Sequence, residues 1–255
     1  MNTAKILGYE TSAAGLSGDI AAAWVILGSG ESGRYVACAN PHSLMEARKD
    51  SSFKQALIGA DILLPDGVGI VLAAKILGLD LVERVAGSDF FGELSRQANE
   101  RGGIRYFFVG STEDVLDKIV VRLGREFPNI EVCGVCSPPF KDELDEEDDA
   151  EIVRKINEAR PDVLWVGMTA PKQEKWIYKN KDRLNVPLIG AIGAVFDFYA
   201  GTKKRAPEWV CSIGMEWLPR LLREPGRLFK RNFISSPLFL LMVLREKFNS
   251  RRTEK

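Results

Sequence analysis

The sequence predicts an α/β fold: a Rossmann-like, largely parallel sheet with helices on both faces, plus a basic helical C-terminal appendage. Two observations lead to this prediction. Short apolar runs of strand length alternate with helical stretches over about 200 residues, as in sheets built from βαβ units. After that point the alternation stops and cations gather. We therefore expect an α/β domain at residues 1–204 and the appendage at residues 205–255.

The expected elements follow from the apolar runs and from the turn residues between them. Strands are expected at residues 4–8, 35–39, 62–64, 104–109, 130–135, 163–166 and 186–192. Helices are expected at residues 16–27, 43–49 and 90–100, after the turn at 65–67 to about residue 77, and after residues 110–112 to residue 125. Two more are expected, one from the acidic run 142–149 to residue 159 and one that begins within residues 167–175. The acidic run is interpreted as a solvated helix start. Pro65 is expected to end the hydrogen-bonded ladder of its strand.

Residues 28–33 form a G-x-G-x-x-G motif, which in dinucleotide-binding proteins follows a strand and opens a helix. Here a helical stretch precedes the motif and a strand follows it directly. We therefore interpret the motif as a helix-to-strand loop. An NAD-linked oxidoreductase remains a weak alternative.

Four cysteines suggest a reducing compartment rather than a disulfide framework. Cys133 and Cys136 have the C-x-x-C spacing, but they lie in an expected strand, no second pair exists, and His42 is the single histidine of the sequence. We expect no metal or redox site there.

Several polar or glycine residues directly follow expected strands. They are Asn40, Asp66, Gly110, Gln173 and Asp197. Since ligands of open parallel sheets bind at the carboxyl ends of the strands, we expect these residues to converge at one edge. Asp66 stands between a strand and a helix, where a carboxylate can cap the helix, orient a hydroxyl or act as a base.

The net charge is zero, but residues 201–255 contain 13 Lys or Arg against 5 Asp or Glu. Arg220, Arg223, Arg227 and Lys230 or Arg231 recur at helical intervals, and the apolar stretch 233–244 follows them. That stretch is too short to span a bilayer but fits a membrane interface. A helical hairpin packed on the domain is the alternative. No nucleic-acid-binding motif is present, and without a signal-peptide pattern we expect a cytoplasmic protein.

Eight short motifs resemble, in order and spacing, the WecG/TagA/CpsF glycosyltransferases (family 26). They are 39–41 (ANP), 64–69 (LPDGVG), 84–89 (RVAGSD), 108–110 (FVG), 171–176 (PKQEKW), 190–197 (GAIGAVFD), 205–207 (RAP) and 214–221 (GMEWLPRL). The resemblance implies an inverting, cofactor-free transfer of a sugar from UDP to an undecaprenyl-diphosphate-linked saccharide. It also implies a peripheral location on the inner face of the cytoplasmic membrane. The donor is left open between N-acetylmannosamine, its uronic acid and a glucose-type sugar.

The resemblance also implies residue roles. Asp66 corresponds to the catalytic base, and Asn40, Arg84 and Gln173 would position the substrates. Gly110 and Gly193 would let the backbone approach the nucleotide, with Asp197 beside them. The appendage arginines Arg220, Arg223, Arg227 and Arg231 would bind the UDP phosphates in place of a metal, and the appendage would complete the active site at an anionic membrane surface.

Two positions depart from the family pattern. Cys38 replaces a frequent Thr, which removes a hydroxyl and could alter sugar choice, and His42 replaces a common acidic residue and is interpreted as a surface histidine. A non-catalytic nucleotide-sugar-binding protein therefore stays open as an alternative. A homo-oligomer is compatible with the family precedent.

Overall fold

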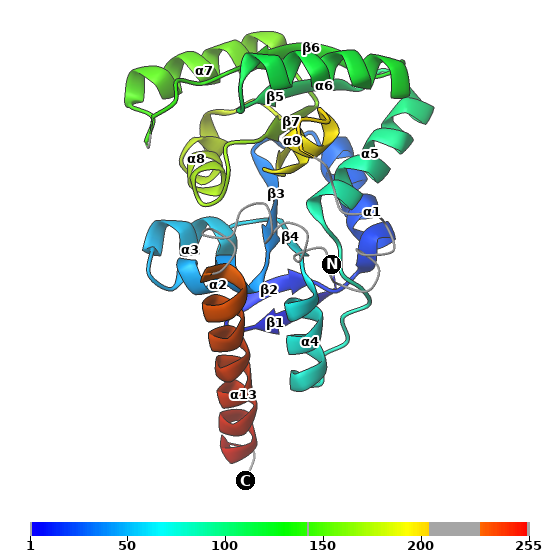
Figure 1. Cartoon of the computed structure of the whole chain (residues 1–255). Helices are drawn as coiled ribbons and strands as arrows, with labels where there is room; N and C mark the ends of the chain where they lie inside the picture. Colours follow the sequence, from blue (N-terminus) through cyan, green and yellow to red (C-terminus); the bar gives the residue numbers. More distant parts are fainter. Residues whose placement is uncertain (1, 142, 204–229, 254–255) are drawn as a thin grey trace.

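The computed structural model describes residues 2–141, 143–203 and 230–253 (Figure 1). Arg220, Arg223 and Arg227 lie outside the described residues, as does the side chain of Arg231.

The centre of the fold is a six-stranded, entirely parallel sheet in the order β4-β3-β8-β7-β5-β6. Its strands are β3 (Arg34–Ala39), β4 (Ile62–Pro65), β5 (Arg105–Val109), β6 (Glu131–Cys136), β7 (Val163–Val166) and β8 (Leu188–Ala191). The helices around it are α1 (Gly15–Gly28), α2 (Pro41–Ala47), α3 (Ser51–Ile58), α4 (Val68–Leu77), α5 (Gly87–Arg101), α6 (Glu113–Glu126), α7 (Glu146–Ala159), α8 (Lys172–Asn180), η1 (Lys181–Arg183) and α9 (Val195–Tyr199). The predicted α/β fold is confirmed.

Helices cover both faces of the sheet, because alternate strand residues point into two separate cores. On β3, Tyr35 and Ala37 face one core, which also contains residues of α2, α3, α4, α7 and α8. Val36 faces the other core, which contains residues of α1, α5, α6 and α9. Strands such as β4, β7 and β8 are therefore buried on both sides, which explains their continuous apolar sequence, whereas the edge strand β6 is partly exposed.

The N-terminal segment differs from the expected single strand at residues 4–8. It forms a separate antiparallel hairpin of β1 (Thr3–Ile6) and β2 (Tyr9–Ser12). Leu7 and Gly8 both have positive φ, 50° and 87°, which is the geometry of a two-residue hairpin turn. A short apolar run shows strand character, but it does not reveal this reversal of direction.

The G-x-G-x-x-G motif lies between the end of α1 at Gly28 and the start of β3 at Arg34, as predicted. The ladder of β4 ends at Pro65, as expected, since Pro65 is the last residue of β4 and stands opposite Ala39 in its last pair. Proline is tolerated there because β4 is an edge strand.

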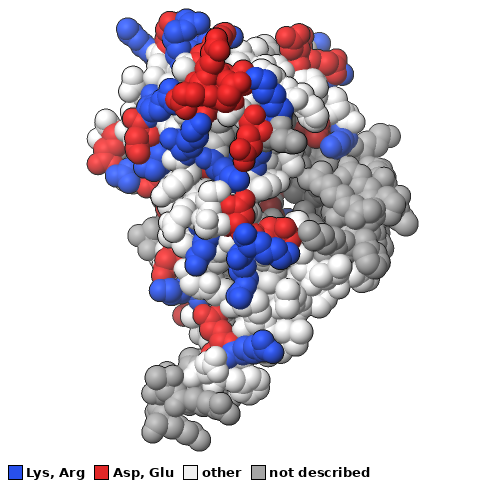
Figure 2. Space-filling view, turned by 90° about the vertical axis from the view of Figure 1, so that its left-hand side faces the viewer, with Lys and Arg blue, Asp and Glu red and all other residues white. Residues whose placement is uncertain are grey.

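The acidic run begins a helix, as expected, but it is solvated only in part, because Asp149 is buried and accepts hydrogen bonds from the indole N–H of Trp176 and from Lys179. Asp145 caps α7, and Lys141 pairs with Asp145 at 2.8 Å and with Asp148 at 2.6 Å. Figure 2 shows acidic and basic side chains interspersed over this face of the molecule. The carboxylates of the run are thus balanced by neighbouring cations.

After the undescribed stretch, the chain continues through η2 (Lys230–Ser235) into α13 (Ser236–Thr253), which packs against α4 and α2. Phe239 and Val243 are fully buried in the core beneath α2 and α4. Figure 1 shows α13 running away from the sheet on the side of β4, opposite α6 and α7. Among the described helices, none is both long and apolar enough to cross a membrane.

Candidate functional site

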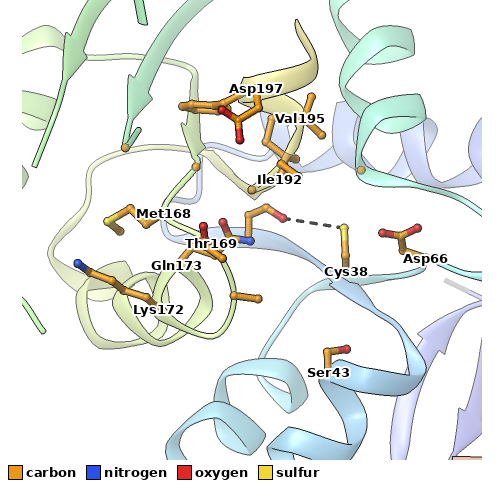
Figure 3. A pocket seen from close by; sticks show the side chains of 18 of the residues that line it. Cys38, Ser43, Asp66, Met168, Thr169, Lys172, Gln173, Ile192, Val195 and Asp197 are labelled. Carbon is orange, nitrogen blue, oxygen red and sulfur yellow. Dashed lines mark hydrogen bonds between the residues drawn. The ribbon is translucent and has the colours of Figure 1, made fainter. Parts of the chain in front are cut away.

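A cavity of about 1450 Å³ opens at the carboxyl edge of the sheet (Figure 3). Its wall contains every predicted site residue that the structure describes with its side chain: Cys38, Asn40, Asp66, Arg84, Gly110, Gln173, Gly193 and Asp197. Most of these residues lie at the ends of β3, β4, β5, β7 and β8 or in the loop or helix that follows each strand, and Arg84 lies in the segment between α4 and α5. The expected convergence at one edge is therefore what the structure shows.

Asp66 directly follows β4 and is half-buried in the cavity wall. Its backbone N–H donates to the carbonyl of Ala39 at 2.8 Å, which ties it to the end of β3. The N-cap of α4 is Gly67, at φ 126°, so Asp66 lies one residue outside the capping position. The capping interpretation of Asp66 is thus not supported, and its carboxylate faces the cavity beside Cys38 (Figure 3).

Asn40, in contrast, is a true helix cap. Its Oδ1 accepts hydrogen bonds from the backbone N–H groups of His42 at 3.1 Å and Ser43 at 3.0 Å, and Ser43 completes a capping box. This fixes the side chain by its oxygen. The Nδ2 group is then the end of Asn40 that can meet a ligand.

Arg84 supplies a cation to the cavity wall. Its guanidinium lies 3.6 Å from the carboxylate of Asp89 in the first turn of α5. Asp89 in turn accepts from the backbone N–H of Ala86 at 3.3 Å. The carboxylate therefore holds the guanidinium at the cavity wall, where its positive charge attracts an anionic ligand.

Cys38 lies between two carboxyl groups. Burial, with smaller contributions from Asp66 and Glu174, raises the pKa of the Cys38 thiol well above its usual value. The neutral thiol points toward the carbonyl of Ala191 at 3.9 Å. Cys38 is therefore a small, weakly polar part of the wall rather than a nucleophile.

Gly110 and Gly193 both have positive φ, and close packing explains why both are glycine. A Cβ on Gly110 would lie 2.7 Å from the backbone carbon of Gly167, and a Cβ on Gly193 would lie 3.1 Å from Oε1 of Gln173. Gly110 thus lets the ends of β5 and β7 approach each other. Gly193 lets the Gln173 amide lie against the backbone.

Asp197 lies at the rim of the cavity, where its carboxylate is already engaged. It pairs with Lys203 at 2.9 Å and accepts a hydrogen bond from the hydroxyl of Thr202 at 3.3 Å. Lys141 and Lys172 line the wall as further cations. Among the described residues, no cluster of His, Cys, Asp or Glu could hold a metal ion.

The cavity wall also contains residues that were not predicted as site residues, among them His42, Phe140 and Glu174. His42 is half-buried, and its Nδ1 lies 2.9 Å from the hydroxyl of Ser235, so it is a partly exposed histidine with a hydrogen-bond partner. Phe140, in the loop after β6, is fully exposed at the cavity. Glu174 is only 2% exposed beside Gln173. The sequence could have indicated Phe140 and Glu174 as site residues, because each lies in a loop or helix start that follows an expected strand.

Comparison with known proteins agrees with the family resemblance of the sequence motifs. The model of the glycosyl transferase WecG/TagA/CpsF family matches residues 4–253. N-acetylglucosaminyldiphosphoundecaprenol N-acetyl-beta-D-mannosaminyltransferase of Bacillus spizizenii is 33% identical over 213 residues, covering 84% of this chain and 79% of that protein. The Bacillus subtilis enzyme of the same name is 32% identical over 219 residues, with coverages of 86% and 82%. That of Staphylococcus aureus strain MW2 is 27% identical over 213 residues, with coverages of 84% and 80%.

Proposed function

Because this chain belongs to the WecG/TagA/CpsF glycosyltransferase family, we propose that it transfers N-acetylmannosamine from a UDP donor to undecaprenyl-diphosphate-linked N-acetylglucosamine. The sugar and acceptor are those in the names of the similar transferases, and teichoic acid or another cell-surface polysaccharide is the product class. The family match favours this activity over an NAD-linked oxidoreductase or a non-catalytic binding protein. The single observation that carries the proposal is the position of Asp66 in a cavity at the carboxyl edge.

In the proposed reaction Asp66 acts as the general base. The acceptor hydroxyl gives its proton to the Asp66 carboxylate while its oxygen attacks the anomeric carbon. The bond from that carbon to the UDP oxygen breaks on the opposite face, and UDP leaves with the bonding electrons. One displacement of this kind inverts the anomeric configuration.

The leaving UDP needs positive charge around it. Among the residues that the structure describes, Arg84 contributes a guanidinium to the cavity wall. We propose that the appendage adds further cations, namely Arg220, Arg223, Arg227 and Arg231. A guanidinium fork matches phosphate oxygens, so these residues can stabilise the diphosphate without a cofactor. In this proposal residues 205–255 complete a site whose other wall is the α/β domain.

The remaining wall residues are proposed to position the substrates. The Nδ2 group of Asn40 and the amide of Gln173 would meet sugar hydroxyl or acetamido groups near Cys38. Gly110, Gly193 and Asp197 also line the cavity, and we propose that they lie next to the bound nucleotide. The exposed ring of Phe140 offers a face of the kind on which nucleobases stack.

An exposed apolar face supports peripheral association with an anionic membrane. It consists of Val68 and Leu72 of α4, Phe233 and Ile234 of η2, and Leu238, Leu241, Leu244 and Phe248 of α13. Val68 and Phe233 also line the cavity, so this face adjoins the proposed site. We propose that this face inserts between the headgroups and acyl chains of the inner leaflet of the cytoplasmic membrane, where the lipid-linked acceptor resides. A homo-oligomer formed through the same face is the competing arrangement.

The test is a transfer assay with the full-length protein, lipid vesicles, a polyprenyl-diphosphate N-acetylglucosamine acceptor and a panel of UDP-sugars. We expect turnover with UDP-N-acetylmannosamine and inverted stereochemistry in the product. Turnover with a glucose-type or uronic acid donor instead would change the assigned sugar. Absence of transfer from every donor would refute the proposed function.

A further inference from the structure

Gln173 and Glu174 form a buried polar pair in the first turn of α8. They are 4% and 2% exposed, and both line the cavity. The side-chain Nε2 of Gln173 donates to Oε1 of Glu174 at 2.9 Å. The other two oxygens, Oε1 of Gln173 and Oε2 of Glu174, are buried without a hydrogen-bond partner among the described residues.

Two unpartnered oxygens in one buried pair call for an explanation, because native structures rarely leave such groups unsatisfied. Figure 3 shows the Gln173 amide beside Thr169, facing the space that Cys38 also borders. A substrate group that enters the cavity can therefore supply the missing hydrogen bond. An acceptor oxygen such as Oε1 requires a hydroxyl or N–H donor from that substrate.

We infer that Glu174 is a positioning residue for sugar transfer: it holds the Gln173 amide by Nε2, so that Oε1 of Gln173 accepts a hydrogen bond from a hydroxyl or acetamido N–H of the donor sugar. This inference rests on the proposed function. The amide is held by Glu174, which accepts at its nitrogen, and it lies so close to Gly193 that a Cβ added there would be 3.1 Å from Oε1. Gln173 would then be presented to the sugar in one orientation.

The charge state of Glu174 decides how strictly that orientation is held. A carboxylate can only accept, so it requires the NH₂ group of Gln173, whereas a neutral carboxyl can also donate to Oε1 of a flipped amide. Tyr35 and Cys38 of β3 are the titratable groups that face Glu174, with Asp66 beyond Cys38, and no described cation offsets its charge. Burial raises the pKa of the Glu174 carboxyl to about 7, so both forms exist near neutral pH.

The test uses the full-length protein with Glu174→Gln, Glu174→Leu, Gln173→Leu and the double variant Gln173→Leu/Glu174→Leu. We expect Glu174→Leu to raise KM for the UDP-sugar about tenfold, the loss of roughly one hydrogen bond, with a smaller change in kcat. The double variant should be no worse than Gln173→Leu. In the wild type KM should fall as pH rises through about 7, and Glu174→Gln should remove that inflection while keeping most of the affinity.

Calorimetric titration with the same UDP-sugar separates the two proposals, because it measures binding without transfer. Thermal unfolding of each variant shows that the fold is retained. A wild-type KM in Glu174→Leu, additive effects in the double variant, or an unchanged pH profile in Glu174→Gln would overturn the role of Glu174 alone. A wild-type protein that neither binds nor turns over any UDP-sugar would overturn the proposed function, and the inference with it.

Discussion

The Nδ1 atom of His42 lies 2.9 Å from the hydroxyl oxygen of Ser235. His42 belongs to the first turn of α2 and lines the cavity, whereas Ser235 is a buried residue at the end of η2. The contact joins residues 193 positions apart and attaches the start of α13 to the wall of the site. The position of the C-terminal helix is thereby coupled to the loop that carries Asn40.

Ser235→Ala should loosen that attachment. Loss of one buried hydrogen bond costs about 1 kcal/mol, so amide hydrogen exchange within α13 should accelerate several-fold. Ser52→Ala is the matched control, because it removes a hydroxyl that bonds Asp50 on the exposed surface of α3. Equal exchange in α13 for both variants would contradict the coupling.

Asp66→Asn should lower kcat for transfer at least about a hundredfold, because the amide cannot take up the acceptor proton. Affinity for the UDP-sugar should change little, since the substitution keeps the shape of the side chain. The measurement is steady-state transfer together with calorimetric UDP-sugar binding, and the control is Asp80→Asn on the exposed segment after α4. Turnover that survives in Asp66→Asn would remove Asp66 as the base.

Gly110→Ala should reduce the free energy of unfolding by at least about 2 kcal/mol, because the new Cβ would clash with backbone and φ is positive. The nearest atom, the backbone carbon of Gly167, would lie 2.7 Å away. Gly124→Ala in α6 is the control, since nothing lies within 4 Å of its added Cβ. Helix propensity should make that variant more stable by up to about 1 kcal/mol. Similar urea midpoints for the two variants would show that the ends of β5 and β7 are not packed as described.

Leu238→Glu combined with Leu241→Glu should weaken binding to anionic lipid vesicles at least about tenfold, because it places charges on the apolar face of α13. Val121→Glu, on α6 at the other end of the molecule, tests the same change outside that face (Figure 1). Vesicle sedimentation gives the binding constants. If the double variant binds like the wild type but changes its oligomeric state, the face is an interface between copies instead.

Asp19 should make the free energy of unfolding depend on pH. It is fully buried in α1, accepts a hydrogen bond from the Ser12 hydroxyl, and burial raises the pKa of its carboxyl from 3.8 to about 6. The folded state therefore binds the proton more tightly than the unfolded state, and the contribution of Asp19 to stability falls as pH rises from about 4 through about 6.

Asp19→Asn does not titrate, so its stability relative to the wild type should increase by up to about 3 kcal/mol between pH 4 and pH 8. Urea unfolding across this range measures the difference. The exposed Asp80→Asn again serves as the control and should show no such trend. A constant difference between Asp19→Asn and the wild type would contradict the burial argument.

Local sequence patterns were sufficient to predict the sheet and the edge where the site lies. Apolar runs such as 163–166 indicate strands, and every parallel strand ends at the same edge, so Asn40, Asp66 and Gln173 could be brought together without knowing the strand order. This inference needs only the direction of the chain and the side-chain period. For the same reason it missed the reversal at Leu7 and Gly8, where two backbone angles change the direction.

Tertiary structure alone decided which side chains are neighbours across the fold. The sequence determined that Asp66 follows a strand, but not that Gly67 takes the capping position of α4 or that Asp66 lines the cavity. Burial of Glu174 beside Gln173, and the contact of His42 with Ser235, also depend on how distant segments pack. Spacing along a chain encodes local conformation, whereas burial and long-range hydrogen bonds arise only when helices and strands occupy their places against one another.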